Sequence, residues 1–198
     1  MPPVDDIQRY LVGAWRLMTG KRDGLALLDI SADGFWNSFF AIVVALPPLI
    51  VGWVGSANEL GDDPAATASR FSYLLRLAIV DLGAWVLPLA ALAVAAPIAG
   101  IRDRFVHYVV AINWASVILA WLLLPVALLR LVVASTSSIF VLASIALFAL
   151  SMVLTWRLTN TVIARGPAMG SAVFAGMFMA SIIVLLVLES IFGIYGSG

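Results

Sequence analysis

The sequence predicts an all-α integral membrane protein with five transmembrane helices preceded by an interfacial amphipathic helix. Two observations support this prediction. Of the 198 residues, 63% are hydrophobic and 11% are charged, and the mean hydropathy is +1.09, whereas soluble domains carry about 25% charged residues. Five apolar runs are also long enough to cross a bilayer as helices, which takes about 20 residues. A soluble fold could not bury this much apolar surface, so lipid is the expected solvent.

The first expected element is an amphipathic helix within a cytoplasmic N-terminal segment, residues 1–33. In "VDDIQRYLVGAWRLMTGKRDG" the apolar side chains recur at helical spacing, and Gly20 is the expected C-cap. We expect this helix to lie in the membrane interface with Trp15 as its anchor. The alternative is a helix packed against the inner ends of the transmembrane bundle. The predicted apolar face consists of Val4, Ile7, Leu11, Ala14, Trp15 and Met18.

A five-helix transmembrane domain is expected to occupy residues 34–198. Four breaks separate its spans and contain the Gly, Pro, polar and charged residues that are typical of loops. The breaks are "SANELGDDPAATAS" (56–69), "GIRDR" (100–104), "ASTSS" (134–138) and "RLTNTVIARGPAMG" (157–170). The spans are therefore predicted near residues 35–55, 77–99, 105–129, 138–157 and 168–193.

Basic residues beside the spans predict the orientation, because cytoplasmic loops are enriched in Lys and Arg. With five spans, the N-terminal segment and the second and fourth loops lie on one side. That side holds eight of the eleven basic residues, and Arg70, Arg76 and Arg130 fall on the other side. The eight are Arg9, Arg16, Lys21, Arg22, Arg102, Arg104, Arg157 and Arg165. We therefore expect a cytoplasmic N-terminus and an external C-terminus.

Charged residues in and beside the spans predict a layer at the outer boundary of the membrane. A helix rises about 1.5 Å per residue, which places Asp81 about 28 Å and Glu189 about 31 Å from the inner ends of their spans. The hydrocarbon core is about 30 Å thick, so both carboxylates are expected at its outer edge. Interfacial ion pairs and snorkelling side chains are the favoured interpretation, and an access point for a substrate or proton is the alternative. The candidate outer charge layer is Arg76, Asp81, Arg130 and Glu189.

Within that layer, Asp81 is expected to interact with another helix and not with Arg76 on its own helix. Five residues of separation turn these two side chains about 140° apart, so they do not face each other as an i,i+4 pair does. Arg130 is the best cationic candidate, because a planar guanidinium can bridge two carboxylates.

Two further groups of residues are candidate sites within the spans. Asn113 and Ser116 are candidate interior polar residues, with Asn113 about 12 Å from the inner end of the third span. We expect the amide to hydrogen-bond across helices, and contact with a transported ligand is the alternative. Ala172, Gly176 and Ala180 recur every four residues and predict a helix-packing seam, which serves either the bundle interior or a dimer.

Several chemistries are excluded by composition and motif. The chain has no cysteine and one histidine, which removes thiolate catalysis and the usual zinc clusters. It contains no P-loop, no H-E-x-x-H and no G-x-S-x-G sequence. Its net charge is zero, which argues against nucleic acid as a partner. We therefore expect no enzymatic activity, no cofactor and no metal, with the lipid bilayer as the main partner.

The segment "DLGAWVLPLAALAVAAPIAGIRDRFVHYVVAINWASVI" (81–118) is similar to bacterial inner-membrane proteins with this layout. The whole arrangement, with an amphipathic N-terminus, five spans and an outward C-terminus, resembles the Yip1 family. The resemblance implies a bacterial inner-membrane protein that organises membrane or serves as a scaffold, as a homo-oligomer or with partner membrane proteins. The alternative function is a small transporter or channel subunit that uses a polar path from Asp81 and Glu189 to Asn113.

The predicted topology can be tested with reporter fusions placed after Gly20, after Gly61 and at the C-terminus. We expect the fusion after Gly20 to be active in the cytoplasm and the other two on the external side, because of the distribution of basic residues. A C-terminal fusion that is active in the cytoplasm would contradict the five-span topology.

Overall fold

The computed structural model describes residues 2–58, 66–132 and 137–194, and every regular element in these ranges is helical. Five helical segments are long and apolar enough to cross a membrane, as predicted. The elements in chain order are α1 (Val4–Met18), the 3₁₀ helix η1 (Arg22–Leu27), α2 (Ala32–Ser38), α3 (Ala41–Asn58), α4 (Ala66–Ile98), the 3₁₀ turn η2 (Arg102–Arg104), α5 (Phe105–Val132), α6 (Ser138–Ile163) and α7 (Pro167–Phe192).

The ends of these helices differ from the predicted span limits in three places. The first span is divided into α2 and α3 by a turn at Phe39 and Phe40. α4 begins at Ala66, eleven residues before its predicted start, and α6 extends into the predicted loop 157–170 as far as Ile163. Polar residues can continue a helix beyond the hydrocarbon, so hydropathy alone makes these two helices too short. Of the predicted breaks, 59–65 and 134–136 lie outside the described residues.

The connection between α6 and α7 is a tight turn instead of the predicted long loop. Ala164 has a φ of 52° and Gly166 a φ of 90°, and Pro167 opens α7. A left-handed residue ends a helix by turning the chain away, and a proline at the first helical position needs no hydrogen-bond partner for its nitrogen. Three residues, 164–166, therefore suffice to reverse the chain.

Pro47 and Pro48 lie inside α3 and leave the carbonyl groups four residues earlier without their helical donors. One of these, the carbonyl oxygen of Val44, accepts a hydrogen bond of 3.2 Å from Nε1 of Trp121 on α5. A neighbouring helix thus satisfies a backbone group that proline has freed, which allows α3 to continue through the proline pair.

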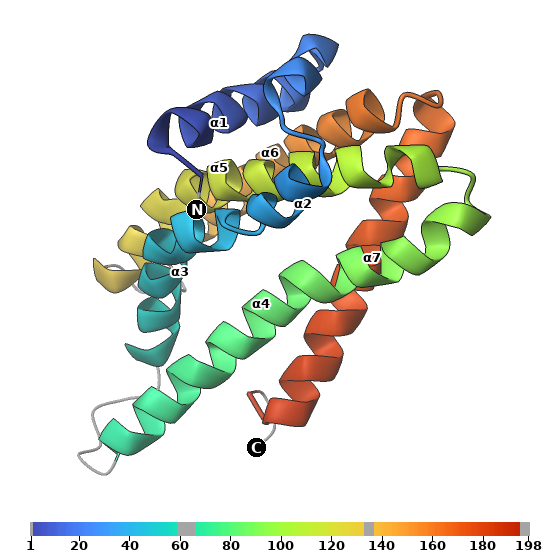
Figure 1. The fold of residues 1–198 in the computed structure, drawn as a ribbon. Coiled ribbons are helices and arrows are strands. Elements are labelled where there is room, and N and C mark those ends of the chain that lie inside the picture. The colour runs from blue at the N-terminus through green and yellow to red at the C-terminus, as the bar shows by residue number, and fades with distance from the viewer. Residues whose placement is uncertain (1, 59–65, 133–136, 195–198) are drawn as a thin grey trace.

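The helices form two packed groups. α3 packs mainly against α5, and α5 packs on α6; α4 packs mainly against α7, and α7 returns to α6. Figure 1 shows α4 crossing α7 beside the layer that contains α3, α5 and α6. A chain of contacts, α3–α5–α6–α7–α4, therefore runs through the bundle.

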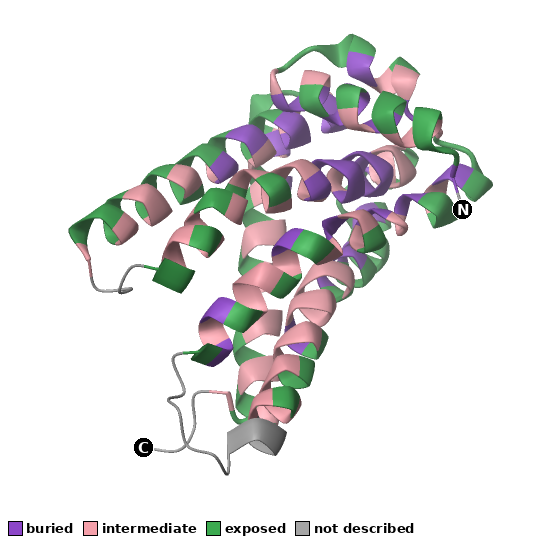
Figure 2. Cartoon of the chain, turned by 90° about the vertical axis from the view of Figure 1, so that its left-hand side faces the viewer, coloured by how far each residue is buried: buried purple, intermediate pink, exposed green. Residues whose placement is uncertain are grey.

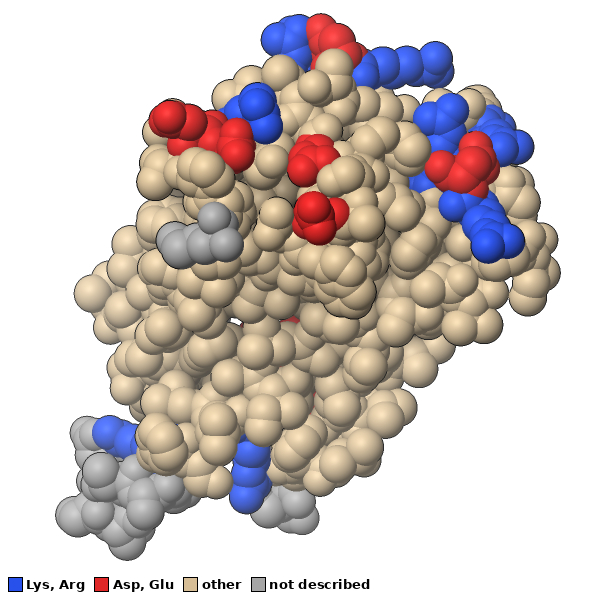
Figure 3. All heavy atoms as spheres, viewed as in Figure 1, with Lys and Arg blue, Asp and Glu red and all other residues tan. Residues whose placement is uncertain are grey.

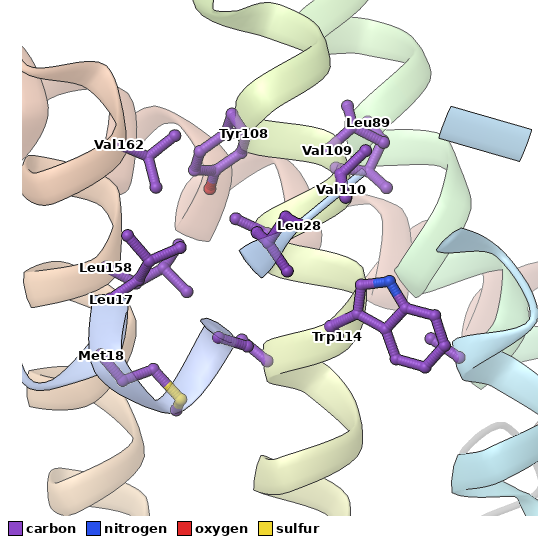
Figure 4. Packing of buried hydrophobic residues seen from close by; sticks show 14 of the residues in the cluster. Leu17, Met18, Leu28, Leu89, Tyr108, Val109, Val110, Trp114, Leu158 and Val162 are labelled. Carbon is purple, nitrogen blue, oxygen red and sulfur yellow. The ribbon is translucent and has the colours of Figure 1, made fainter. Parts of the chain in front are cut away.

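The tightest packing lies where α1 covers parts of α5 and α6. Leu17 and Met18 of α1 are fully buried, as are Tyr108 of α5 and Leu158 of α6 (Figure 4). Buried residues gather beneath α1, whereas the far ends of α4 and α7 are mostly exposed or half-buried (Figure 2). The core is thus concentrated at one end of the bundle.

This packing bears on the predicted position of the amphipathic helix. Ala14 and Met18 from the predicted apolar face are buried against the bundle, which is the alternative that the sequence left open. Trp15 is 48% exposed and Val4 is 67% exposed, so both point away from that contact. Contact of this exposed apolar surface with lipid remains a prediction.

α1 is held in place by the chain that follows it. Gly20 adopts a φ of 84°, as expected for a residue that ends a helix, and directs the chain back along α1. At Gly13 and Gly24 the backbones of α1 and η1 come so close that a Cβ on either glycine would press on the carbonyl oxygen of the other. Only glycine fits at this contact.

We expect Gly24→Ala to destabilise the protein by about 1–3 kcal/mol, because the added methyl group must displace the backbone of α1. The measurement is the thermal unfolding midpoint of the purified protein in detergent. Gly52→Ala in α3 is the matched control, since a Cβ there meets no atom within 4 Å. Equal midpoints for Gly24→Ala and the unmodified protein would show that the two backbones are not in close contact.

Candidate functional site

Asn113 is the centre of a hydrogen-bonded group that joins three helices. The residue lies on α5 and is fully buried. Its Oδ1 accepts a hydrogen bond of 2.9 Å from Nε1 of Trp85 on α4, and its Nδ2 donates one of 2.9 Å to Oγ of Ser38 at the end of α2. Ser38 Oγ in turn donates to the carbonyl oxygen of Phe35 at 2.7 Å. The amide therefore bonds across helices, as the sequence analysis expected.

Ser116, the second candidate interior residue, does not take part in this group. Its hydroxyl donates a hydrogen bond of 2.9 Å to the carbonyl oxygen of Ile112 on its own helix. Ser116 instead lines a half-open cavity next to the Asn113 group.

This cavity has a volume of about 310 Å³ and lies among α4, α5, α6 and α7. Phe174 and Phe178, whose rings are stacked with centroids 6.3 Å apart, form part of its wall. The hydroxyl-bearing residues Ser116, Thr155 and Ser181 are among the few polar residues that line it. A cavity of this chemistry suits an apolar molecule with a few hydroxyl contacts better than an ion, because a buried charge needs close polar partners.

The outer charged residues are connected mainly through α3. Oδ2 of Asp81 accepts a hydrogen bond of 2.6 Å from Nε1 of Trp53, and Nη1 of Arg130 donates one of 2.8 Å to Oγ of Ser56. Trp53 and Ser56 are three residues apart, so they lie on one face of α3. Asp81 is thus bonded to another helix, as expected, but its hydrogen-bond donor is a tryptophan and not the predicted Arg130.

The other two members of the predicted layer lie toward α7. Nη1 of Arg76 donates a hydrogen bond of 3.0 Å to the carbonyl oxygen of Phe192, the last residue of α7. Glu189 is half-buried on α7, three residues before Phe192. The four residues therefore make contacts among α3, α4, α5 and α7, but Asp81 lies near the middle of α4 (Ala66–Ile98) and not at its end, because this helix begins well before its predicted start.

Hydrogen bonds from tryptophan are the contacts between helices that the sequence analysis missed. Four indole N–H groups donate between helices: Trp53 and Trp85 are half-buried, and Trp121 and Trp156 are exposed. An indole that is removed from water usually requires such a partner. The signal was present in the sequence as seven tryptophans, several of them inside apolar runs. The four pairs are Trp53 with Asp81, Trp85 with Asn113, Trp121 with the Val44 carbonyl group and Trp156 with Ser171.

Ala172, Gly176 and Ala180 line an open groove between α4 and α7 with a volume of about 280 Å³. Gly176 is exposed, and a Cβ on it would meet no atom within 4 Å. The close approach of α4 and α7 occurs elsewhere, at Gly83, where the side chain of Leu188 lies over the glycine. The predicted seam is therefore not a tight contact inside this chain.

Ion pairs gather near η1 and η2 and the α6–α7 turn. Oδ1 of Asp103 binds Nη2 of Arg165 at 2.9 Å, and Nη2 of Arg157 donates to the carbonyl oxygen of Thr19 at 2.7 Å. The hydrogen-bonded Arg16 guanidinium holds the pKa of Asp23 below its usual range. Figure 3 shows charged side chains at two ends of the molecule with a broad uncharged belt between them.

Comparisons with protein-family models, with curated proteins and with solved structures found no match for this chain. The class of protein is thus defined by its fold alone: an all-helical protein with five helical segments long and apolar enough to cross a membrane. Membership of the Yip1 family remains a hypothesis.

We expect Asn113→Leu to destabilise the protein by about 1–3 kcal/mol, because it leaves the Trp85 indole N–H buried without its acceptor. Trp85→Phe removes that donor and should also lower the free energy of unfolding. The double variant should lose less stability than the sum of the two single losses, since both changes remove the same hydrogen bond. The measurement is thermal unfolding in detergent, with Ser116→Ala as a control expected within about 0.5 kcal/mol of the unmodified protein. Strictly additive costs would contradict a direct bond between Asn113 and Trp85.

Proposed function

We propose that the protein is embedded in a bacterial inner membrane and acts there, without enzymatic activity, as a membrane-organising or scaffold protein of the Yip1-like type. The proposed orientation has the N-terminus in the cytoplasm and the C-terminus outside. The five long apolar helices support the membrane location. The eight basic residues on the N-terminal side, against three on the other, support the orientation.

The observation that best supports a structural role is that polar groups inside the spans are hydrogen-bonded to neighbouring helices. Asn113 and Asp81 each accept a hydrogen bond from a tryptophan on a neighbouring helix. Groups that are engaged in this way hold helices together, whereas a pathway for polar solutes needs groups that can exchange partners with the solute. The cavity beside Asn113 is mainly apolar, which also favours contact with lipid or with another apolar molecule.

A small transporter or channel subunit is the second candidate, and the position of the cavity favours it. Its wall includes Trp85, which bonds to Asn113, and Ala84, which is three residues from Asp81 on the same helix. A path from Asp81 and Glu189 to Asn113 would pass through this space.

Reconstitution into vesicles separates the two candidates. For a membrane-organising protein, we expect vesicles that contain the protein to differ in size or shape from protein-free vesicles by electron cryo-microscopy. We also expect their proton permeability to be unchanged, because the polar groups are already bonded within the protein. Asp81→Asn should leave both results unaltered, since an asparagine oxygen can still accept from Trp53.

Two results would overturn this proposal. Vesicle shapes that are the same with and without the protein would contradict a membrane-organising role. A proton flux that requires the protein and is lost in Asp81→Asn would support the transporter instead.

A further inference from the structure

The groove between α4 and α7 has the form of a site for a single extended chain. Its base includes Leu92 and Val173, which are each 8% exposed, and its volume is about 280 Å³. Both of its sides are built from small residues spaced by four, which keeps the groove open toward the surroundings of the bundle. These are Ala91 and Ala95 on α4 with Ala99 directly after it, and Ala172, Gly176 and Ala180 on α7.

The length of the groove matches one leaflet of a bilayer. It extends along α4 from Pro88 to Ala99, the residue after the helix, and along α7 from Met169 to Ala180, which is roughly 16 Å on either side. Half of the hydrocarbon thickness is about 15 Å. A transmembrane helix about 10 Å across would occupy roughly 1,200 Å³ over the same length, so a second helix could only rest on the rim. An acyl chain is thin enough to enter.

Charge at one end of the groove indicates which kind of lipid would bind. That end is formed by Ala99, Ile101 and Met169, directly beside the η2 turn and the start of α7. Three arginines and one aspartate lie at this turn and in the adjoining α6–α7 connection, which leaves two positive charges in excess. They are Arg102, Asp103, Arg104 and Arg165, with Arg165 bound to Asp103 at 2.9 Å. Figure 3 shows basic side chains grouped around acidic ones at the upper right, where α4 and α7 reach η2 in the same view.

We propose that this groove binds one anionic phospholipid, with an acyl chain between α4 and α7 and the phosphate group against the arginines of the η2 turn and Arg165. Basic residues at the cytoplasmic ends of transmembrane helices attract anionic headgroups, and guanidinium groups match phosphate oxygens in geometry. Pro88 and Met177 line both the groove and the half-open cavity, so the two spaces adjoin. The lipid site rests on the proposed function, because it names the membrane component that a membrane-organising protein would hold.

The site can be tested by native mass spectrometry of the purified full-length protein in detergent. The probes are phosphatidylglycerol and phosphatidylcholine with identical acyl chains. We expect one phosphatidylglycerol to be retained in preference to phosphatidylcholine. Arg102→Gln should lower that preference roughly fivefold, as expected for the loss of one basic residue. Gly176→Leu should lower retention of both lipids, because the larger side chain fills the groove.

Gly52→Leu is the matched control, since Gly52 and Gly176 are both helical glycines at which a Cβ meets no atom within 4 Å. It should retain lipid as the unmodified protein does. Equal retention of lipid by Gly176→Leu and Gly52→Leu, or equal retention of the two headgroups by the unmodified protein, would overturn the site. A dimer that Gly176→Leu alone disrupts would show that a second copy occupies the groove, and this too would overturn it.

The outcome also separates this inference from the proposed function. If lipid retention follows the expected pattern but vesicle shape is unaltered, the lipid site is supported and the membrane-organising role is rejected. Altered vesicles without selective lipid retention would reject the site alone.

Discussion

The hydrogen bonds of Asn113 are the constraint around which the bundle is arranged. A primary amide buried among apolar helices must find both a donor and an acceptor, because an unpaired polar group is costly where water is absent. Trp85 and Ser38 meet this requirement from two different helices. The bond to Trp85 fixes α4 against α5, and the bond to Ser38 fixes the end of α2 just before the chain turns into α3. The relative positions of three elements thus depend on one side chain.

Hydrogen bonds also fix the relative position of α3 and α5 farther along these two helices. These helices run in the same direction, and polar contacts join them at Val44 and at Ser56, in addition to the Ser38 contact that precedes α3. Between apolar helices in lipid, burial of apolar side chains gives little preference for one register over another, since lipid chains are equally apolar. Directional hydrogen bonds do distinguish registers. The spacing of these contacts along the pair therefore fixes how α3 and α5 are aligned.

The sequence predicted the number of long apolar helices because hydropathy and length report directly on the capacity to cross a bilayer. It was less informative about helix ends, since residues 66–76 are helical although they include polar side chains. It also predicted that Asp81 and Asn113 would bond across helices. It did not predict that the partners would be Trp53 and Trp85, because the choice of donor depends on how neighbouring helices are rotated. That rotation is a property of packing and not of any local pattern.

The burial of α1 has a consequence for biosynthesis. Its buried face packs on α5 and α6, and the bond from Arg157 to Thr19 spans 138 residues of sequence. α1 therefore leaves the ribosome long before its partners exist. Long-range contacts of this kind form late and leave apolar surface uncovered in the meantime. An amphipathic helix can rest on the membrane surface during that interval. Docking of α1 on the bundle must therefore wait until both α5 and α6 have been made, so this contact cannot guide the insertion of the helices that precede them.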